Sequence, residues 1–149
     1  MRQAIMTAMQ ILSKEFVMGN DFDSVIKSSN LKKSIHSFDM LGEAARTKSQ
    51  AEGFYNSYVE AIERVAKLNR EFGINHGVSI KLSALHPRYE TLKYDLIKKE
   101  ILNSILSLVN LAYQNDVEIT IDAEEQHRLS ISQDSVSYTH LTLPTKRIV

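Results

Sequence analysis

The chain has 149 residues, with 18 basic and 18 acidic side chains and therefore no formal net charge. This balance gives no electrostatic reason for binding to nucleic acid, and no nucleic-acid partner is expected for this segment. With 43% apolar and 24% charged residues, the composition is that of a globular domain and excludes a disordered chain. The absence of cysteine excludes disulfides, thiolate metal ligands and a thiol nucleophile, and it fits a cytoplasmic location.

Two helices are predicted at the start of the chain. Apolar residues at helical spacing predict an amphipathic helix over residues 1–17, and a second, short helix is expected over 23–32. No stretch reaches the ~18 apolar residues of a membrane span. Residues 1–12 lack the pattern of a signal peptide.

Strands and helices alternate in the rest of the chain. Short apolar runs that end near Gly or Pro predict strands over 35–41, 78–85 and 117–123. The order is helix, then strand, helix, strand, helix, strand. This order favours an α/β fold with parallel strands.

The two helices between these strands carry recognisable start and stop signals. Ser49 and Glu52 have the spacing of a capping box, so the first of the two helices is expected to begin there, and Gly73 is its natural stop. Its aromatic residues, Tyr58 among them, are expected to pack in the core. The second helix is predicted over 92–114 from its apolar stripe.

Polar and apolar residues alternate along each predicted strand, which gives each strand one polar face. This face carries Asp39, Lys81, Asp122 and Glu124, and Glu43 follows the first strand. The carboxyl ends of parallel strands are where α/β folds place active sites, so these five residues are the candidate site. The alternative interpretation is a solvated sheet face. Because the carboxylates outnumber Lys81 and unpaired buried charge is costly, further cations are expected from a part of the fold that is not present in this chain.

Two further motifs have ordinary structural explanations. Glu124 and His127 form Glu-x-x-His once, which is better explained as an acidic helix start than as a metal site, and no metal is predicted. The His86-Pro87-Arg88 turn is interpreted equally well as the mouth of a substrate site or as a rigid loop.

The residues after Asp134 depart from this pattern. The string over 136–145, VSYTHLTLPT, resembles the translated product of a transposase adapter used in library preparation. The segment 135–149 is therefore expected to be a non-native tail. The remaining chain is predicted to divide into a helical lead-in over 1–33 and a partial barrel over 34–134.

Three strand motifs carry a resemblance to a known family. They are SFDMLGEAA over 37–45, SIKLSALHPRY over 79–89 and IDAEE over 121–125. Together they resemble the first three strand motifs of proline dehydrogenases, in particular the proline dehydrogenase domain of bifunctional bacterial proline utilisation flavoenzymes. The spacing of 41 positions from Lys81 to Asp122 fits that family as well. One departure is Phe38, where the family usually has tyrosine.

The resemblance implies a fold and a reaction. The fold would be the N-terminal portion, about three βα units, of a (β/α)8 barrel preceded by helices. The reaction would be FAD-dependent oxidation of L-proline to pyrroline-5-carboxylate, in which a hydride passes from a ring carbon beside nitrogen to the flavin. Electrons would leave to quinone, which implies peripheral association of the whole protein with the inner membrane.

The resemblance also assigns roles to the five site residues. Lys81 would bind the proline carboxylate, and Asp122 would lie beside substrate and flavin, so these two are the expected catalytic residues. Glu43 would be the acidic half of an ion-pair gate, Asp39 a wall of the substrate site, and Glu124 a support of its strand end. The main FAD contacts would lie outside this chain, which by itself is expected to bind FAD poorly and not to turn over.

The sequence leaves two alternative functions open. Another (β/α)8 enzyme could use the same lysine and carboxylates on a different small carboxylic acid. If the segment 135–149 is genuine, a non-catalytic interaction module is the second alternative.

Overall fold

The computed structural model describes residues 2–13, 22–26, 29–90, 94–124 and 128–142. Contacts divide the chain into two compact units, residues 1–35 and residues 36–149. Among the described helices, none combines the length and the apolar character that crossing a bilayer requires.

The first unit is helical. It contains α1 (Arg2–Ser13), α2 (Phe22–Ile26) and the 3-10 turn η1 (Ser29–Lys32). The helix predicted over 1–17 is confirmed over Arg2–Ser13, and the other five positions, 1 and 14–17, lie outside the described residues. The helix predicted over 23–32 is instead a short α-helix and a 3-10 turn, with 27–28 outside the described residues.

The second unit contains a parallel sheet. Its strands are β1 (Ser37–Asp39), β2 (Gly77–Ile80) and β3 (Glu118–Ile121), in the order β1-β2-β3. Both pairings are parallel, and β2 lies between the other two strands. The predicted class, an α/β fold with parallel strands, is confirmed for the described residues.

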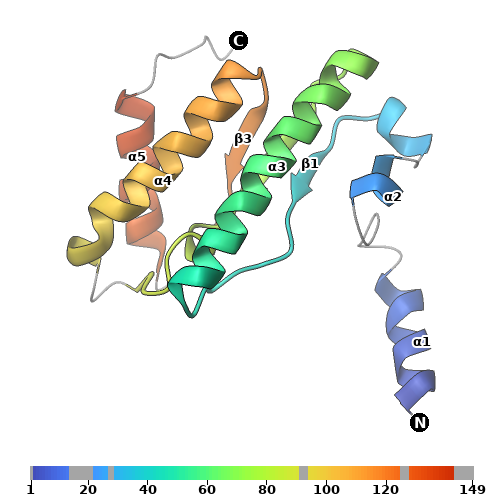
Figure 1. Cartoon of the computed structure of the whole chain (residues 1–149), viewed down its shortest axis with the longest axis horizontal. Helices are drawn as coiled ribbons and strands as arrows, with labels where there is room; N and C mark the ends of the chain where they lie inside the picture. Colours follow the sequence, from blue (N-terminus) through green and yellow to red (C-terminus); the bar gives the residue numbers. More distant parts are fainter. Residues whose placement is uncertain (1, 14–21, 27–28, 91–93, 125–127, 143–149) are drawn as a thin grey trace. The chain divides into compact units, whose positions relative to one another are not determined.

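Helices pack against this sheet. The helices α3 (Lys48–Phe72) and α4 (Tyr94–Gln114) lie side by side, α3 against β2 and α4 against β3 (Figure 1). Apolar side chains between these helices and the strands form the core. Its fully buried members include Ile62, Val65, Val78, Ile80, Ile101, Ile105 and Leu108.

The start of α3 corrects the predicted capping box. The N-cap is Thr47, two residues before Ser49, and its hydroxyl accepts a hydrogen bond of 3.1 Å from the backbone N–H of Gln50. The Gln50 side chain accepts in turn from the backbone N–H of Arg46 at 2.9 Å. These bonds satisfy the N–H groups of Gln50 and Arg46, whereas the predicted box would have satisfied those of Glu52 and Ser49. At the other end, Gly73 caps the helix at φ 66°, as predicted.

The second strand is shorter than predicted. The sequence favoured a strand as far as Leu85, but β2 ends at Ile80 and the 3-10 turn η2 (Leu82–Ala84) follows. The backbone N–H of Lys81 donates to the hydroxyl of Tyr58 at 3.0 Å, and Ala84 N–H donates back to the Lys81 carbonyl at 3.1 Å. These bonds turn the chain at Lys81 because they replace the ladder bonds that would extend the strand.

The last described element is α5 (Leu129–Thr142). It packs against α4 and continues through Asp134 into residues of the segment expected to be a non-native tail. Ser135 in this helix is fully buried. The interpretation of 135–149 as non-native stays a prediction.

Candidate functional site

Three charged residues meet where the strands end. Asp39 closes β1, Lys81 follows β2 directly, and Asp122 follows β3 directly. The Lys81 Nζ forms an ion pair with Asp39 Oδ1 and lies 3.4 Å from Asp122 Oδ2. The sequence predicted this meeting, since parallel strands bring their carboxyl ends to one edge of the sheet.

Lys81 is placed by a residue that sequence reasoning assigned only to the core. Tyr58 comes from α3, its ring is buried, and its hydroxyl accepts the Lys81 backbone N–H. Burial raises the pKa of Tyr58, and the hydrogen bond from Lys81 opposes that effect. No motif in the sequence links these two residues, which are 23 positions apart.

Asp122 is oriented by a buried serine. The Ser79 hydroxyl donates to Asp122 Oδ1, and the Asp122 backbone N–H donates to the Ile80 carbonyl at 3.0 Å. Ser79 is only 5% exposed. Its bond to Oδ1 leaves Oδ2 on the side of Lys81. Ser79 lies two positions before Lys81 in the polar alternation of its strand, but its role as the partner of Asp122 comes from the structure.

The carboxylates keep Lys81 charged. Burial lowers the pKa of Lys81, but the hydrogen bond and charge of Asp39, together with Asp122, outweigh burial and raise the pKa above its ordinary value. The Lys81 side chain is 17% exposed. A lysine ammonium has three donors, and two of them face Asp39 and Asp122. One donor remains to bind an anion.

A cavity of about 340 Å³ lies beside this cluster. Four of the five predicted site residues line it, and Asp39 reaches it only through its ion pair with Lys81. The lining residues are Glu43, Ala44, Lys81, Ser83, Asp122, Ala123, Glu124 and Arg128.

Glu124 has structural partners in this cavity. Its carboxylate, only 7% exposed, accepts the Ser83 backbone N–H at 2.9 Å and lies 3.5 Å from Arg128 Nη1. Arg128 also stacks over the ring of Tyr89, at 5.8 Å from its centroid. The sequence interpretation named Lys81 as the one cation of the site within this chain and so missed Arg128, while cations from outside the chain stay a prediction. The i, i+4 spacing of Glu124 and Arg128 was the signal for it.

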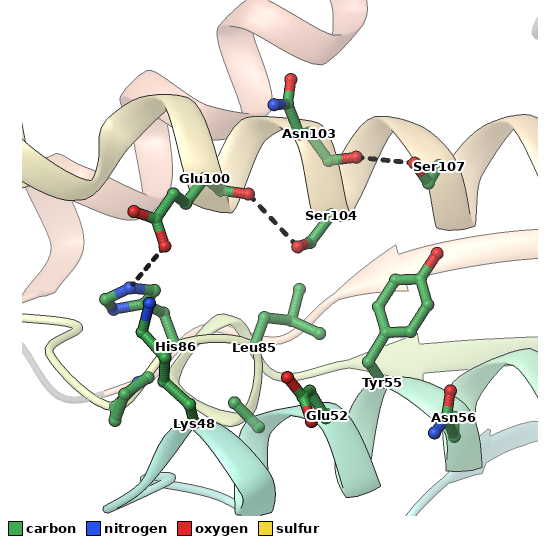
Figure 2. Close-up of a pocket in the computed structure, with 12 residues that line it drawn as sticks. Lys48, Glu52, Tyr55, Asn56, Leu85, His86, Glu100, Asn103, Ser104 and Ser107 are labelled. Atoms are coloured by element: carbon green, nitrogen blue, oxygen red, sulfur yellow. Dashed lines mark hydrogen bonds and ion pairs between the residues drawn. The ribbon is translucent and has the colours of Figure 1, made fainter.

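A second cavity, of about 490 Å³, lies between α3 and α4 (Figure 2). His86 lies at one end of it, with Nε2 3.4 Å from Glu100 Oε2, while its Nδ1 accepts the Arg88 backbone N–H at 3.1 Å. Neither His86 nor Pro87 lines the cavity of Lys81. His86 and Pro87 do line a neighbouring cavity of about 310 Å³ that shares three lining residues with the cavity of Lys81, so both interpretations of the turn stay predictions.

A metal ion would need a cluster of ligating side chains, and a flavin would need cations for its phosphates. Within the described residues, no group of three or more His, Asp or Glu side chains is arranged to hold a metal ion, and His127 lies outside those residues. A flavin dinucleotide brings two phosphates. The described cations that line the Lys81 cavity are Lys81, which pairs with two carboxylates, and Arg128, which contacts Glu124. The cavity therefore fits a small zwitterion and does not fit the whole dinucleotide.

The fold and the site together define a class. The chain is an α/β protein with a parallel sheet, helices packed against that sheet, and a lysine held between carboxylates at the carboxyl edge, which is where such folds bind ligands. The family model of proline dehydrogenase matches residues 23–145. The chain belongs to the proline dehydrogenase family.

Individual relatives agree with this membership. The chain is 41% identical over 138 residues to the Bifunctional protein PutA of Escherichia coli, which covers 89% of this chain and 10% of the relative. A mutant of Bradyrhizobium japonicum Proline Utilization A matches with a TM-score of 0.71 and 36% identity over 93% of this chain and 14% of its own. The Bdellovibrio bacteriovorus protein, with a TM-score of 0.82 and 21% identity, covers 93% of this chain and 16% of its own, and it shows the shared fold. The chain thus spans about a tenth of the length of the PutA relatives that it matches.

Proposed function

We propose that this chain supplies the substrate-carboxylate corner of a proline dehydrogenase that oxidises L-proline to pyrroline-5-carboxylate. The observation that carries the proposal is Lys81, held charged between Asp39 and Asp122 with its third donor beside a small cavity. Membership of the family and the name of the Escherichia coli relative support the substrate and the reaction. The parallel sheet would be part of a (β/α)8 barrel.

The charges around the cavity suit an amino acid. Its lining has three carboxylates, from Glu43, Asp122 and Glu124, and two cations, Lys81 and Arg128. Lys81 would bind the substrate carboxylate, because a charge-assisted hydrogen bond from its ammonium group fixes the position of an anion. Asp122 would lie near the ring nitrogen, whose positive charge it stabilises, and Glu43 would be the acidic half of an ion-pair gate at the cavity. Glu124 would support the site through Ser83 rather than contact substrate.

Further parts of the proposal rest on the family resemblance. FAD would accept the hydride, quinone would accept the electrons, and the whole protein would associate peripherally with the inner membrane from a cytoplasmic location. Residues outside this corner would hold the flavin, so the 149-residue chain alone would not turn over. The alternative that uses the same residues is another barrel enzyme acting on a different small acid.

A segment graft tests this function. Residues 36–134 of this chain would replace the aligned segment of the Escherichia coli relative, and proline-dependent reduction of an artificial electron acceptor would be measured. We expect oxidation of proline, and a loss of about 10- to 100-fold in kcat/KM for Lys81→Met, the value of a charged hydrogen bond. Lys67→Met, an exposed lysine on α3, is the matched control and should leave the rate unchanged. A flavin-loaded graft that does not oxidise proline, or that tolerates Lys81→Met, contradicts the proposal.

A further inference from the structure

The loop that carries Glu43 is held by one residue of η2. The backbone N–H of Ala44 donates to Ser83 Oγ at 3.0 Å, and the backbone N–H of Ala45 donates to the Ser83 carbonyl at 3.0 Å. Ser83 is 1% exposed and Ala45 is also buried, while Ala44 itself lies at the surface. Two consecutive peptide groups after Glu43 are thus fixed by the same side chain and backbone.

The backbone of this loop has unfavourable dihedral angles, so it depends on stabilising contacts. Ala44 has φ +49°, in the left-handed region where a Cβ atom is disfavoured. Gly42, two positions earlier, has φ +139°, and a Cβ there would lie 2.3 Å from the ring of Phe54. A strained backbone persists only where its surroundings determine it. At Ala44, the bond to the Ser83 hydroxyl is such a determinant.

Ser83 also reaches the third strand. Its backbone N–H donates to Glu124 Oε1 at 2.9 Å, and Glu124 Oε2 lies 3.5 Å from Arg128. Ser83 therefore connects the loop after β1 to the turn after β2 and to the residues after β3. Ala44, Ser83, Glu124 and Arg128 all line the cavity that Lys81 and Glu43 line.

We infer that Ser83 is the positioning residue for Glu43. Its hydroxyl holds Ala44 in the left-handed conformation, and the peptide between Glu43 and Ala44 sets the direction in which the Glu43 side chain leaves the backbone. Without the hydroxyl, Ala44 relaxes and Glu43 leaves the cavity. The effect on substrate rests on the proposed function. The stabilisation of Ala44 by Ser83 is a property of this chain alone.

Hydrogen exchange in the 149-residue chain tests, without substrate, whether the Ser83 hydroxyl stabilises the backbone at Ala44. In Ser83→Ala, the Ala44 amide should exchange about tenfold faster or more, while the Ala45 amide changes less because its carbonyl partner survives. Ser132→Ala removes another buried hydroxyl, bonded to Tyr89 at 3.0 Å, and should leave Ala44 unchanged. Unchanged exchange at Ala44 in Ser83→Ala, or equal acceleration in Ser132→Ala, overturns the inference.

A second variant distinguishes the local stabilisation of Ala44 by Ser83 from a general loss of stability. If Ser83→Ala also accelerates exchange at Ile105 in the core, Ala44→Gly is added to it. Glycine adopts the left-handed conformation without the Cβ penalty, so the double variant should recover part of the unfolding midpoint. An unfolding midpoint that does not recover overturns the inference.

The graft described above tests the effect on substrate. Ser83→Ala should raise the KM for proline about fivefold with kcat within twofold, and it should add nothing in a Glu43→Gln background, because both changes act through one carboxylate. Additive effects show that Ser83 does not act through Glu43 and overturn that claim. A graft with Ser83 intact that fails to oxidise proline contradicts the proposed function instead, and the exchange measurements then decide the inference about Ser83.

Discussion

The strands β2 and β3 have the same pattern but different surroundings. In register, Ser79 pairs with Thr120 and Ile80 with Ile121, and each strand is followed by a charged residue of the site. Yet Ser79 and Ile80 are buried, whereas Thr120 is exposed and Ile121 is partly exposed. Alternation in the sequence therefore predicts which side chains share a face, but not how far that face is covered.

The position of each strand in the sheet explains the difference. β2 has a neighbour on both edges and α3 packed against it, while β3 has β2 on one edge among the described residues. Ser79 is covered further by Asp122, which reaches across from β3 to accept its hydroxyl. Lys81 thus follows the strand that is covered more fully, and the comparison of β2 with less covered positions can be tested by substitution.

The largest expected effect comes from the paired isoleucines. Ile80→Ala should lower the free energy of unfolding by about 3–4 kcal/mol, because it leaves a cavity in a fully buried place. Ile121→Ala, its partner in register, should cost about 1–2 kcal/mol because Ile121 is already partly exposed. Urea unfolding of both variants measures the difference. Equal losses would show that the two strands are equally covered.

The next effect concerns the close approach of β2 to β3. A Cβ at Gly77 would lie 3.0 Å from the Glu118 carbonyl oxygen and 3.2 Å from the Glu118 Cβ, so Gly77→Ala should cost about 1–3 kcal/mol. Gly53 in α3 is the control, because nothing lies within 4 Å of the added Cβ. Gly53→Ala should raise stability by about 0.5–1 kcal/mol, the helical preference for alanine. Thermal unfolding that ranks the two variants in the opposite order would contradict the close approach.

A smaller difference in the free energy of unfolding is expected between Ser79 and Thr120, which pair in register. Ser79→Ala removes a buried donor to Asp122 and should cost about 1–2 kcal/mol. Thr120→Ala, on the exposed side of β3, should cost about 0.5 kcal/mol or less. The comparison is made by denaturant unfolding at neutral pH. A cost at Thr120 as large as that at Ser79 would assign the loss to strand propensity rather than to the bond with Asp122.

The smallest effect is a pH dependence that follows from Lys81. Its pKa is raised in the folded chain, so its stabilising contribution is complete below the ordinary value of 10.5 and is lost as the pH rises through the higher folded pKa. The expected contribution is about 0.5–1 kcal/mol, because Asp39 is half exposed. Unfolding of the unmodified chain and of Lys81→Met is compared from pH 7 to 11, with Lys67→Met as the control for lost charge. A stability difference that persists unchanged above the folded pKa would contradict this linkage.

Much of the arrangement follows from local sequence signals. The order of strands and helices, the glycine that ends α3 and the meeting of Lys81 with Asp39 and Asp122 were all predicted. Apolar periodicity and a left-handed cap depend on residues close together in the chain. The meeting of the charged residues joins distant positions, but it follows from the alternation of strands and helices, which makes the strands parallel and brings their carboxyl ends to one edge. Resemblance to the family strand motifs rests on the same short segments.

Other features depend on residues far apart in the chain, and only the tertiary structure decided them. The end of β2 depends on Tyr58, 23 positions away, and the orientation of Asp122 depends on Ser79, 43 positions away. The loop of Glu43 depends on Ser83, which is 39 positions from Ala44. A hydroxyl in a sequence has the same donor and acceptor wherever it lies. Its partner is fixed only when packing buries both groups and excludes the water that would otherwise satisfy them.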